Sequence, residues 1–91
     1  MKKKVIVNKK LSVKMRLIEI VGWYGTVAIV GAYALSSFSI LSSSNLLYQI
    51  INLTGAIGIV IVSFSKKAYQ PGVLNMIWTV IALIAIIKIL L

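Results

Sequence analysis

The sequence predicts an all-α membrane protein, a bundle of three transmembrane helices. Of its 91 residues, 60% are hydrophobic and only 12% are charged, and the mean hydropathy is +1.05. A soluble domain averages about 45–50% apolar and about 25% charged residues, and a short soluble chain buries too little surface to hide such an excess. The apolar residues form three continuous runs, whereas barrel strands would alternate and would here be too few to close.

Each apolar run is long enough to cross a bilayer as a helix. The runs cover residues 17–38, 45–64 and 71–91, and helices of roughly 20 residues cross a ~30 Å hydrocarbon core. Asn45 and the serines before it are good helix N-caps, and Pro71 suits the first helical position, where its absent N–H costs nothing. The short loops make neighbouring spans antiparallel.

The basic residues predict the orientation of the chain. The net charge is +9, and nine of the ten basic residues lie in a tail over residues 1–16, ahead of the transmembrane domain at 17–91, or at Lys66 and Lys67 between the last two spans. Because basic loops stay in the cytoplasm, we expect a multi-pass protein of the cell inner membrane with a cytoplasmic N-terminus and an outside C-terminus. The tail is either a disordered topology signal or a segment that contacts anionic lipid.

Two other interpretations of the basic N-terminal region are less well supported. A basic start followed by Ala32-Tyr33-Ala34 resembles a cleavable signal peptide, but the apolar run continues past these residues and contains Glu19. Nucleic-acid binding would need aromatic residues among the lysines of the tail, and there are none. We therefore expect an uncleaved first span, with the lipid bilayer and no nucleic acid as a partner.

The residue types exclude most catalytic chemistry. The chain has no cysteine or histidine, and Glu19 is its only acidic residue. This composition excludes thiolate chemistry, the usual zinc sites and paired-carboxylate mechanisms, so we expect no enzyme, no metal and no cofactor. Glu19 lies near one end of the first span, where it either reaches the interface or pairs with Arg16, Lys66 or Lys67.

Small and polar residues predict which helix faces meet. Lipid tails are as apolar as leucine, so helices in a bilayer associate through close packing and hydrogen bonds. We expect the packing faces to contain Gly22, Gly25, Gly55, Gly58, Gln49 and Tyr48. Glu19, Thr26 and Tyr33 fall near the Gly22 face at helical spacing and are expected to point inward with it.

Two amides and two indoles are the candidate solute-binding residues: Asn75, Trp78, Asn52 and Trp23. An amide both donates and accepts hydrogen bonds and an indole stacks on an apolar surface, so the set suits a small neutral polar solute. In the alternative, structural interpretation the asparagines are hydrogen-bonding links between helices and the tryptophans fill the core. No charged residue lies at mid-membrane, which argues against a proton pump.

These residues resemble those of a family of small, uncharacterised bacterial membrane proteins with about three spans. The resemblance rests on Gly22-Trp23-Tyr24-Gly25, on Leu47-Tyr48-Gln49 with Asn52, Gly55 and Ala56, and on Pro71 with Asn75 and Trp78. It implies no particular activity. A second resemblance, to SemiSWEET half-transporters, rests on Pro71 followed by Asn75 and implies a three-helix bundle that dimerises around a sugar site. The Pro-Gln pair typical of the first SemiSWEET helix is absent.

Two functions are compatible with these features. The first is an accessory or structural protein that binds helices, either of its own copies or of a partner membrane protein. The second is a transporter of a small neutral polar solute, which would have to be a homo-oligomer because three helices cannot enclose a solute path. Water access separates the two, because only a transporter must hydrate Asn52 and Asn75.

Overall fold

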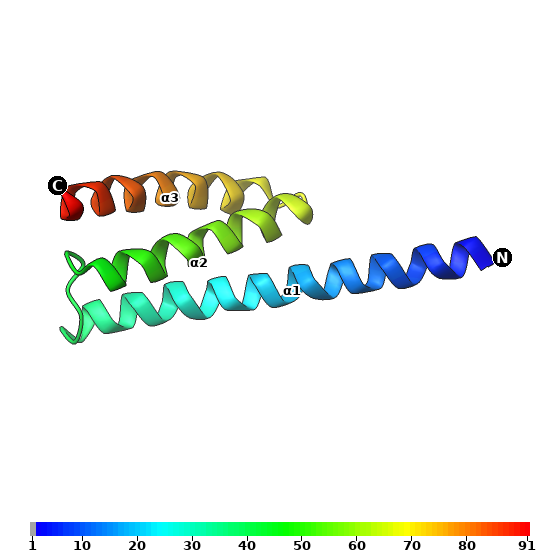
Figure 1. Ribbon diagram of the computed structural model, residues 1–91, viewed down its shortest axis with the longest axis horizontal. Coiled ribbons are helices and arrows are strands. Elements are labelled where there is room, and N and C mark those ends of the chain that lie inside the picture. Colours follow the sequence, from blue (N-terminus) through cyan, green and yellow to red (C-terminus); the bar gives the residue numbers. More distant parts are fainter. Residues whose placement is uncertain (1) are drawn as a thin grey trace.

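The computed structural model describes residues 2–91, with side chains from Lys9 onward, and contains three helices. They are α1 (Lys2–Ser37), α2 (Leu46–Ser65) and α3 (Tyr69–Leu90) (Figure 1). Each is long and apolar enough to cross a membrane, over Lys9–Ser37, Leu46–Ser65 and Tyr69–Leu90. The prediction of an all-helical chain with three apolar helices is therefore confirmed.

The two connections set where the helices begin and end. The side-chain carbonyl of Asn45 accepts the backbone N–H of Leu47 at 2.8 Å, which caps α2 as predicted. At the other end of α2, the backbone N–H of Ala68 donates to the carbonyl of Ser63 at 2.7 Å, and Lys67 adopts a positive φ of 59°. Helix α3 then begins at Tyr69, two residues before the predicted start, so Pro71 lies within the first turn. Backbone N–H groups of the first turn have no helical partner, so proline is accommodated there.

Helix α2 lies at the centre and packs against both other helices. Among the described residues, no Cα atom of α1 lies within 8 Å of a Cα atom of α3, and α2 separates the two helices (Figure 1). The buried hydrophobic residues of the described chain are all alanines: Ala28, Ala32, Ala56 and Ala82. The bundle is therefore held by close approach of helix backbones, while its large apolar side chains point outward.

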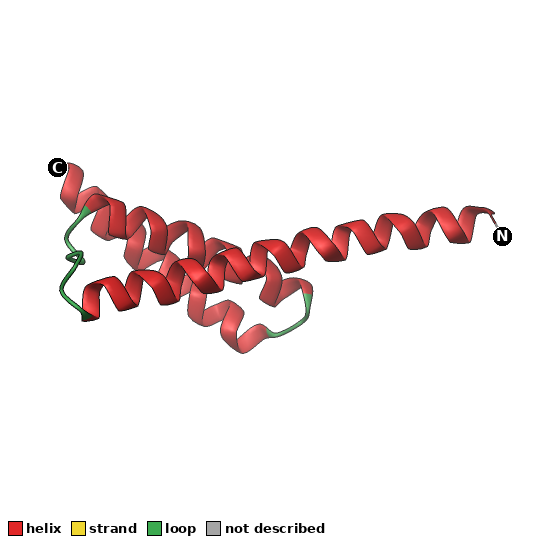
Figure 2. Cartoon of the chain, turned by 90° about the horizontal axis from the view of Figure 1, so that it is seen from below, coloured by secondary structure: helices red, strands yellow, loops and turns green. Residues whose placement is uncertain are grey.

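Helix α1 extends far beyond the other two, past the α2–α3 turn (Figures 1 and 2). It has 36 residues, and the longest dimension of the molecule is 56 Å, which is close to the ~54 Å that such a helix spans. The basic tail is thus helical from Lys2 and continuous with the first span. The structure thus gives this segment a helical backbone, whereas the first interpretation of the tail expects disorder.

Candidate functional site

The α1–α2 contact is formed by glycines and alanines at the centre of both helices. A Cβ atom built on Gly25 would lie 2.7 Å from the backbone carbonyl oxygen of Gly55, and one built on Gly58 would lie 3.0 Å from the carbonyl oxygen of Val21. A Cβ on Gly25 would therefore force the two backbones apart, and one on Gly58 would make a contact tighter than most, because in both places the nearest atom belongs to the partner backbone. The same seam includes Ala28, whose Cβ would lie 3.0 Å from a Cβ on Gly55.

A hydrogen bond between side chains links α1 to α2 on the outside of this seam. The Tyr24 hydroxyl and the Thr54 hydroxyl lie 2.7 Å apart. Each hydroxyl can donate or accept, and Thr54 also donates to the backbone of its own helix at 3.0 Å. The pair fixes the register of α1 along α2.

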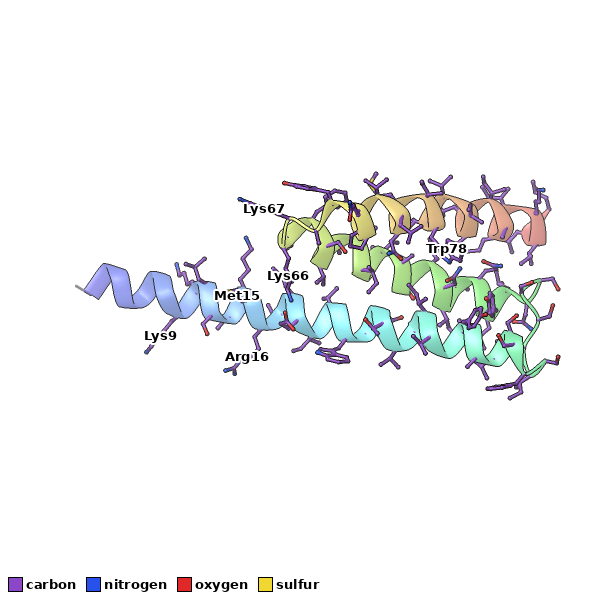
Figure 3. The ribbon with its side chains drawn as sticks, turned by 180° about the vertical axis from the view of Figure 1, so that it is seen from behind. Lys9, Met15, Arg16, Lys66, Lys67 and Trp78 are labelled. Carbon is purple, nitrogen blue, oxygen red and sulfur yellow. The ribbon has the colours of Figure 1, made fainter. Side chains whose placement is uncertain are left out.

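A hydrogen bond between two of the predicted solute-binding residues joins α2 to α3. The indole N–H of Trp78 donates to the side-chain carbonyl of Asn52 at 3.2 Å, and Trp78 lies between the two helices (Figure 3). Asn52 is buried, at 9% exposure. Near the α2–α3 turn, Gly72 packs against the ring of Phe64, which would lie 3.0 Å from a Cβ at that position.

A groove runs between α1 and α3, with Ile59 of α2 between them, because the backbones of the two outer helices stay apart. We name it the α1–α3 groove; its volume is ≈ 340 Å³. Its lining is apolar except for one hydroxyl, one amide and one indole, and consists of Thr26, Ile29, Val30, Ile59, Leu74, Asn75 and Trp78. Two of the four predicted solute-binding residues therefore line one groove, and a third, Asn52, is bonded to one of them.

The polar groups near this groove are paired within the chain. The Asn75 amide donates to the carbonyl of Pro71 at 2.9 Å, and the Thr79 hydroxyl donates to the carbonyl of Asn75 at 2.7 Å. The Thr26 hydroxyl donates to the carbonyl of Gly22 at 3.0 Å. Within the described part of the chain, no buried side-chain nitrogen or oxygen lacks a hydrogen-bond partner. Both amides therefore already have a hydrogen-bond partner within the chain.

Trp23, the fourth predicted residue, lies elsewhere. It is 67% exposed and lines a second groove, between α1 and α2, together with Gly22, Ile59 and Val62. Glu19 and Lys66 form an ion pair across the end of this groove. Of the partners considered for Glu19, the structure therefore selects Lys66. The interpretation of Trp23 as a core residue of this chain is wrong.

The remaining predicted packing residues are placed as follows. Gln49 is buried, and its amide donates to the carbonyl of Ser43 in the loop before α2 at 2.6 Å. Tyr48 beside it is half-buried. Tyr33, expected to point inward, is 71% exposed, and that prediction is wrong because the inward face of α1 passes through Ala28 and Ala32. The inward face of α1 could have been predicted from the small residues at 22, 25, 28 and 32, since residues three or four apart share a helix face.

The hydrogen bond between Asn52 and Trp78 gives a first testable prediction. In a double-mutant cycle of Asn52→Leu and Trp78→Phe, we expect a coupling free energy of about 0.6 kcal/mol and at most about 1.7 kcal/mol, the range found for side-chain hydrogen bonds between membrane helices. Equilibrium unfolding in detergent would measure it. A coupling of zero would show that the bond does not link α2 to α3.

The fold defines the class: in its described part the chain is all-helical, with three helices of membrane-spanning length and hydrogen-bond partners for its buried polar side chains. A family model matches residues 18–91. The chain belongs to this family, whose function is uncharacterised. Comparisons with curated proteins and with solved structures found no match. The comparisons give no support to the resemblance to SemiSWEET half-transporters.

Proposed function

We propose that the protein is an accessory membrane protein whose α1–α3 groove binds a transmembrane helix of a second copy of the chain. In this proposal the three helices span the cell inner membrane with the N-terminus in the cytoplasm, and the chain has no catalytic activity. The observation that carries the proposal is that, in the described part of the chain, the Cα atoms of α1 and α3 stay more than 8 Å apart, which leaves a groove between the two helices.

The groove has the properties that membrane helices use to associate. Its walls are mostly aliphatic, and its polar groups are a hydroxyl and an amide, the kinds of side chain that link helices in lipid. The exposed apolar surface of α3 also supports association with a further helix. In the described part of the chain, α3 packs only against α2, and most of its apolar residues, among them Leu74 and Ile77, are about half exposed or more.

The proposed orientation is supported by the basic residues before the first span and at Lys66 and Lys67, and by the lack of any basic residue in the loop between the first two spans. Single cysteines in place of Ser43 and Ser65 should react with an impermeant reagent from opposite sides of intact cells. Reaction of both from the outside would refute the orientation.

A groove-filling substitution tests the binding of a second copy. Val30 lines the groove and is 61% exposed, so Val30→Trp fills the groove without disturbing the packing of the chain itself. We expect self-association to weaken by about tenfold or more, equivalent to ~1.4 kcal/mol. Energy transfer between labelled copies in vesicles, measured as the protein is diluted with lipid, would report it.

Val27→Trp is the matched control, because Val27 lies on the same helix, is 65% exposed and does not line the groove. We expect this variant to associate like the parent chain. A parent chain that is monomeric at every dilution, or a Val27→Trp variant as weak as Val30→Trp, would overturn the proposal.

A transporter is the second candidate, because Asn75 and Trp78 line the same groove. An amide beside an indole would suit a neutral hydroxylated solute. The internal pairing of both side chains favours the accessory function. Uptake of neutral sugars by vesicles containing the protein, abolished in Asn75→Ala and Trp78→Ala, would reverse this order.

A further inference from the structure

Basic side chains gather at one end of the bundle, around the α2–α3 turn. The described ones on the free part of α1 and on the turn are Lys9, Lys10, Lys14, Arg16, Lys66 and Lys67. Figure 3 shows Lys9 and Arg16 along the extension of α1, with Lys66 and Lys67 on the turn beside it. Glu19, the only acidic residue, is paired with Lys66. The other cations at this end have no acidic side chain in the chain to pair with.

The Glu19–Lys66 ion pair gives a reference point from which the distance of each basic residue along α1 can be measured. It joins α1 to the end of α2, so Glu19 marks the edge of the apolar bundle. Arg16 and Lys14 then lie ~4.5 and ~7.5 Å beyond that edge. A bilayer is ~30 Å thick in its hydrocarbon core and about 40–45 Å with headgroups, which leaves a headgroup layer of roughly 5–8 Å on each side.

The basic residues of α1 form two groups that differ in their distance from the headgroup layer. Lys14 and Arg16 fall within the headgroup layer, together with Lys66 and Lys67 on the turn. Lys2, Lys3 and Lys4 start the helix ~23–26 Å beyond Glu19. The helix backbone at these three residues lies more than a Debye length of ~8 Å beyond the headgroup layer, a distance at which salt screens charges from the lipid.

An apolar groove opens directly below the membrane-proximal charges. This is the α1–α2 groove that Trp23 lines, with a volume of ≈ 280 Å³. Lys66 and Glu19 lie at its rim, and Gly22, Ile59 and Val62 form part of its walls. A cationic rim above an apolar groove complements a lipid with a negative headgroup and an acyl chain.

We propose that this end of the protein binds an anionic phospholipid. The phosphate is held by Lys66, at the rim of the α1–α2 groove, and by Arg16, which shares a helix face with Trp23, and one acyl chain lies in the groove beside Trp23. Lys14 and Lys67 lie at the same level on other faces and add positive charge to the headgroup region. The Lys66 ammonium carries three donors, so its ion pair with Glu19 leaves donors for the phosphate. The proposal requires the helices to cross a bilayer, and its groove adjoins the one proposed to bind a second copy, since Thr26 and Ile59 line both.

The test measures the lipid composition next to Trp23. The full chain is placed in vesicles of phosphatidylglycerol and phosphatidylcholine with identical chains, in which one lipid or the other is brominated and quenches nearby tryptophan fluorescence. The signal of Trp23 is the difference between the parent chain and Trp23→Phe, a substitution at an exposed position. We expect phosphatidylglycerol to be enriched beside Trp23 several-fold over its bulk fraction, and the enrichment to fall with added salt.

Two triple variants with the same change in charge locate the binding site. The proximal variant carries Lys14→Gln, Arg16→Gln and Lys67→Gln, and the distal variant carries Lys2→Gln, Lys3→Gln and Lys4→Gln. Each basic residue near a charged surface contributes roughly fivefold to lipid binding. We expect the proximal variant to lose the enrichment and the distal variant to keep it.

Three results would overturn the proposal. They are a parent chain with no enrichment, an equal loss in both variants, and an enrichment that survives in the proximal variant. A monomeric parent chain that still enriches phosphatidylglycerol would refute the second-copy proposal alone, and a self-associating chain without enrichment would refute the lipid proposal alone.

Discussion

Replacing Gly25 with leucine is expected to separate α1 from α2. A Cβ at this position would lie 2.7 Å from the Gly55 carbonyl oxygen and 3.1 Å from the Ile59 side chain. The oxygen belongs to the backbone and cannot rotate away, so the helices must move apart. Overpacking of this kind costs about 1–3 kcal/mol and occasionally more. Unfolding in detergent would measure the loss, and spin labels on α1 and α2 would measure the separation.

Gly31→Leu is the control for this experiment, because it makes the same change on the same helix. No heavy atom outside the local helix lies within 4 Å of a Cβ built on Gly31. We expect its stability to remain within about 0.5 kcal/mol of the parent chain, as for most exposed substitutions. Equal losses at Gly25 and Gly31 would mean that the close approach at Gly25 does not hold the bundle.

The number of apolar segments and their helical structure could be predicted from the sequence, because lipid offers no hydrogen-bond partners to the backbone. A continuous apolar run of this length satisfies its backbone in lipid only as a helix, and Asn45 marks the start of α2 with a side chain suited to capping. The length of α1 could not be predicted in the same way. Its lysines carry no apolar signal, yet the helix continues through them to Lys2.

The inward faces were harder to predict than the helices. An apolar side chain has a similar free energy against lipid and against another helix, so hydropathy does not distinguish lipid-facing from helix-facing positions. Prediction from polarity placed Asn52 correctly on a helix contact, where it accepts from Trp78. It failed for Tyr33, which is 71% exposed. The residues that define the α1 seam, Ala28 and Ala32, are neither polar nor large, and their signal is spacing alone.

The grooves could not be predicted from the sequence, because they depend on which helix takes the centre. Asn75 and Trp78 share a groove with Thr26 only because α2 separates α1 from α3. Trp23 was grouped with them by residue type and depth, yet it lies in the other groove. Depth along a span can be read from the helical rise, whereas direction around the helix depends on the neighbours.

Replacing Ala82 with leucine is expected to separate α3 from α2 and to leave the α1–α2 contact intact. Ala82 has 0% exposure, and in the described part of the chain α3 packs against α2 alone. The added carbons must therefore enter the α2–α3 contact. The expected loss is again about 1–3 kcal/mol. Ala85→Leu on the same helix is the control, since Ala85 is half-buried whereas Ala82 has no exposed surface.

The two leucine substitutions together test the central position of α2. Because α1 and α3 meet only through α2, Gly25→Leu should increase the α1–α2 distance alone and Ala82→Leu the α2–α3 distance alone. Spin labels placed across each contact would measure both distances in both variants. A change across both contacts in either variant would show that the three helices pack as one unit, and it would remove the basis for an open α1–α3 groove.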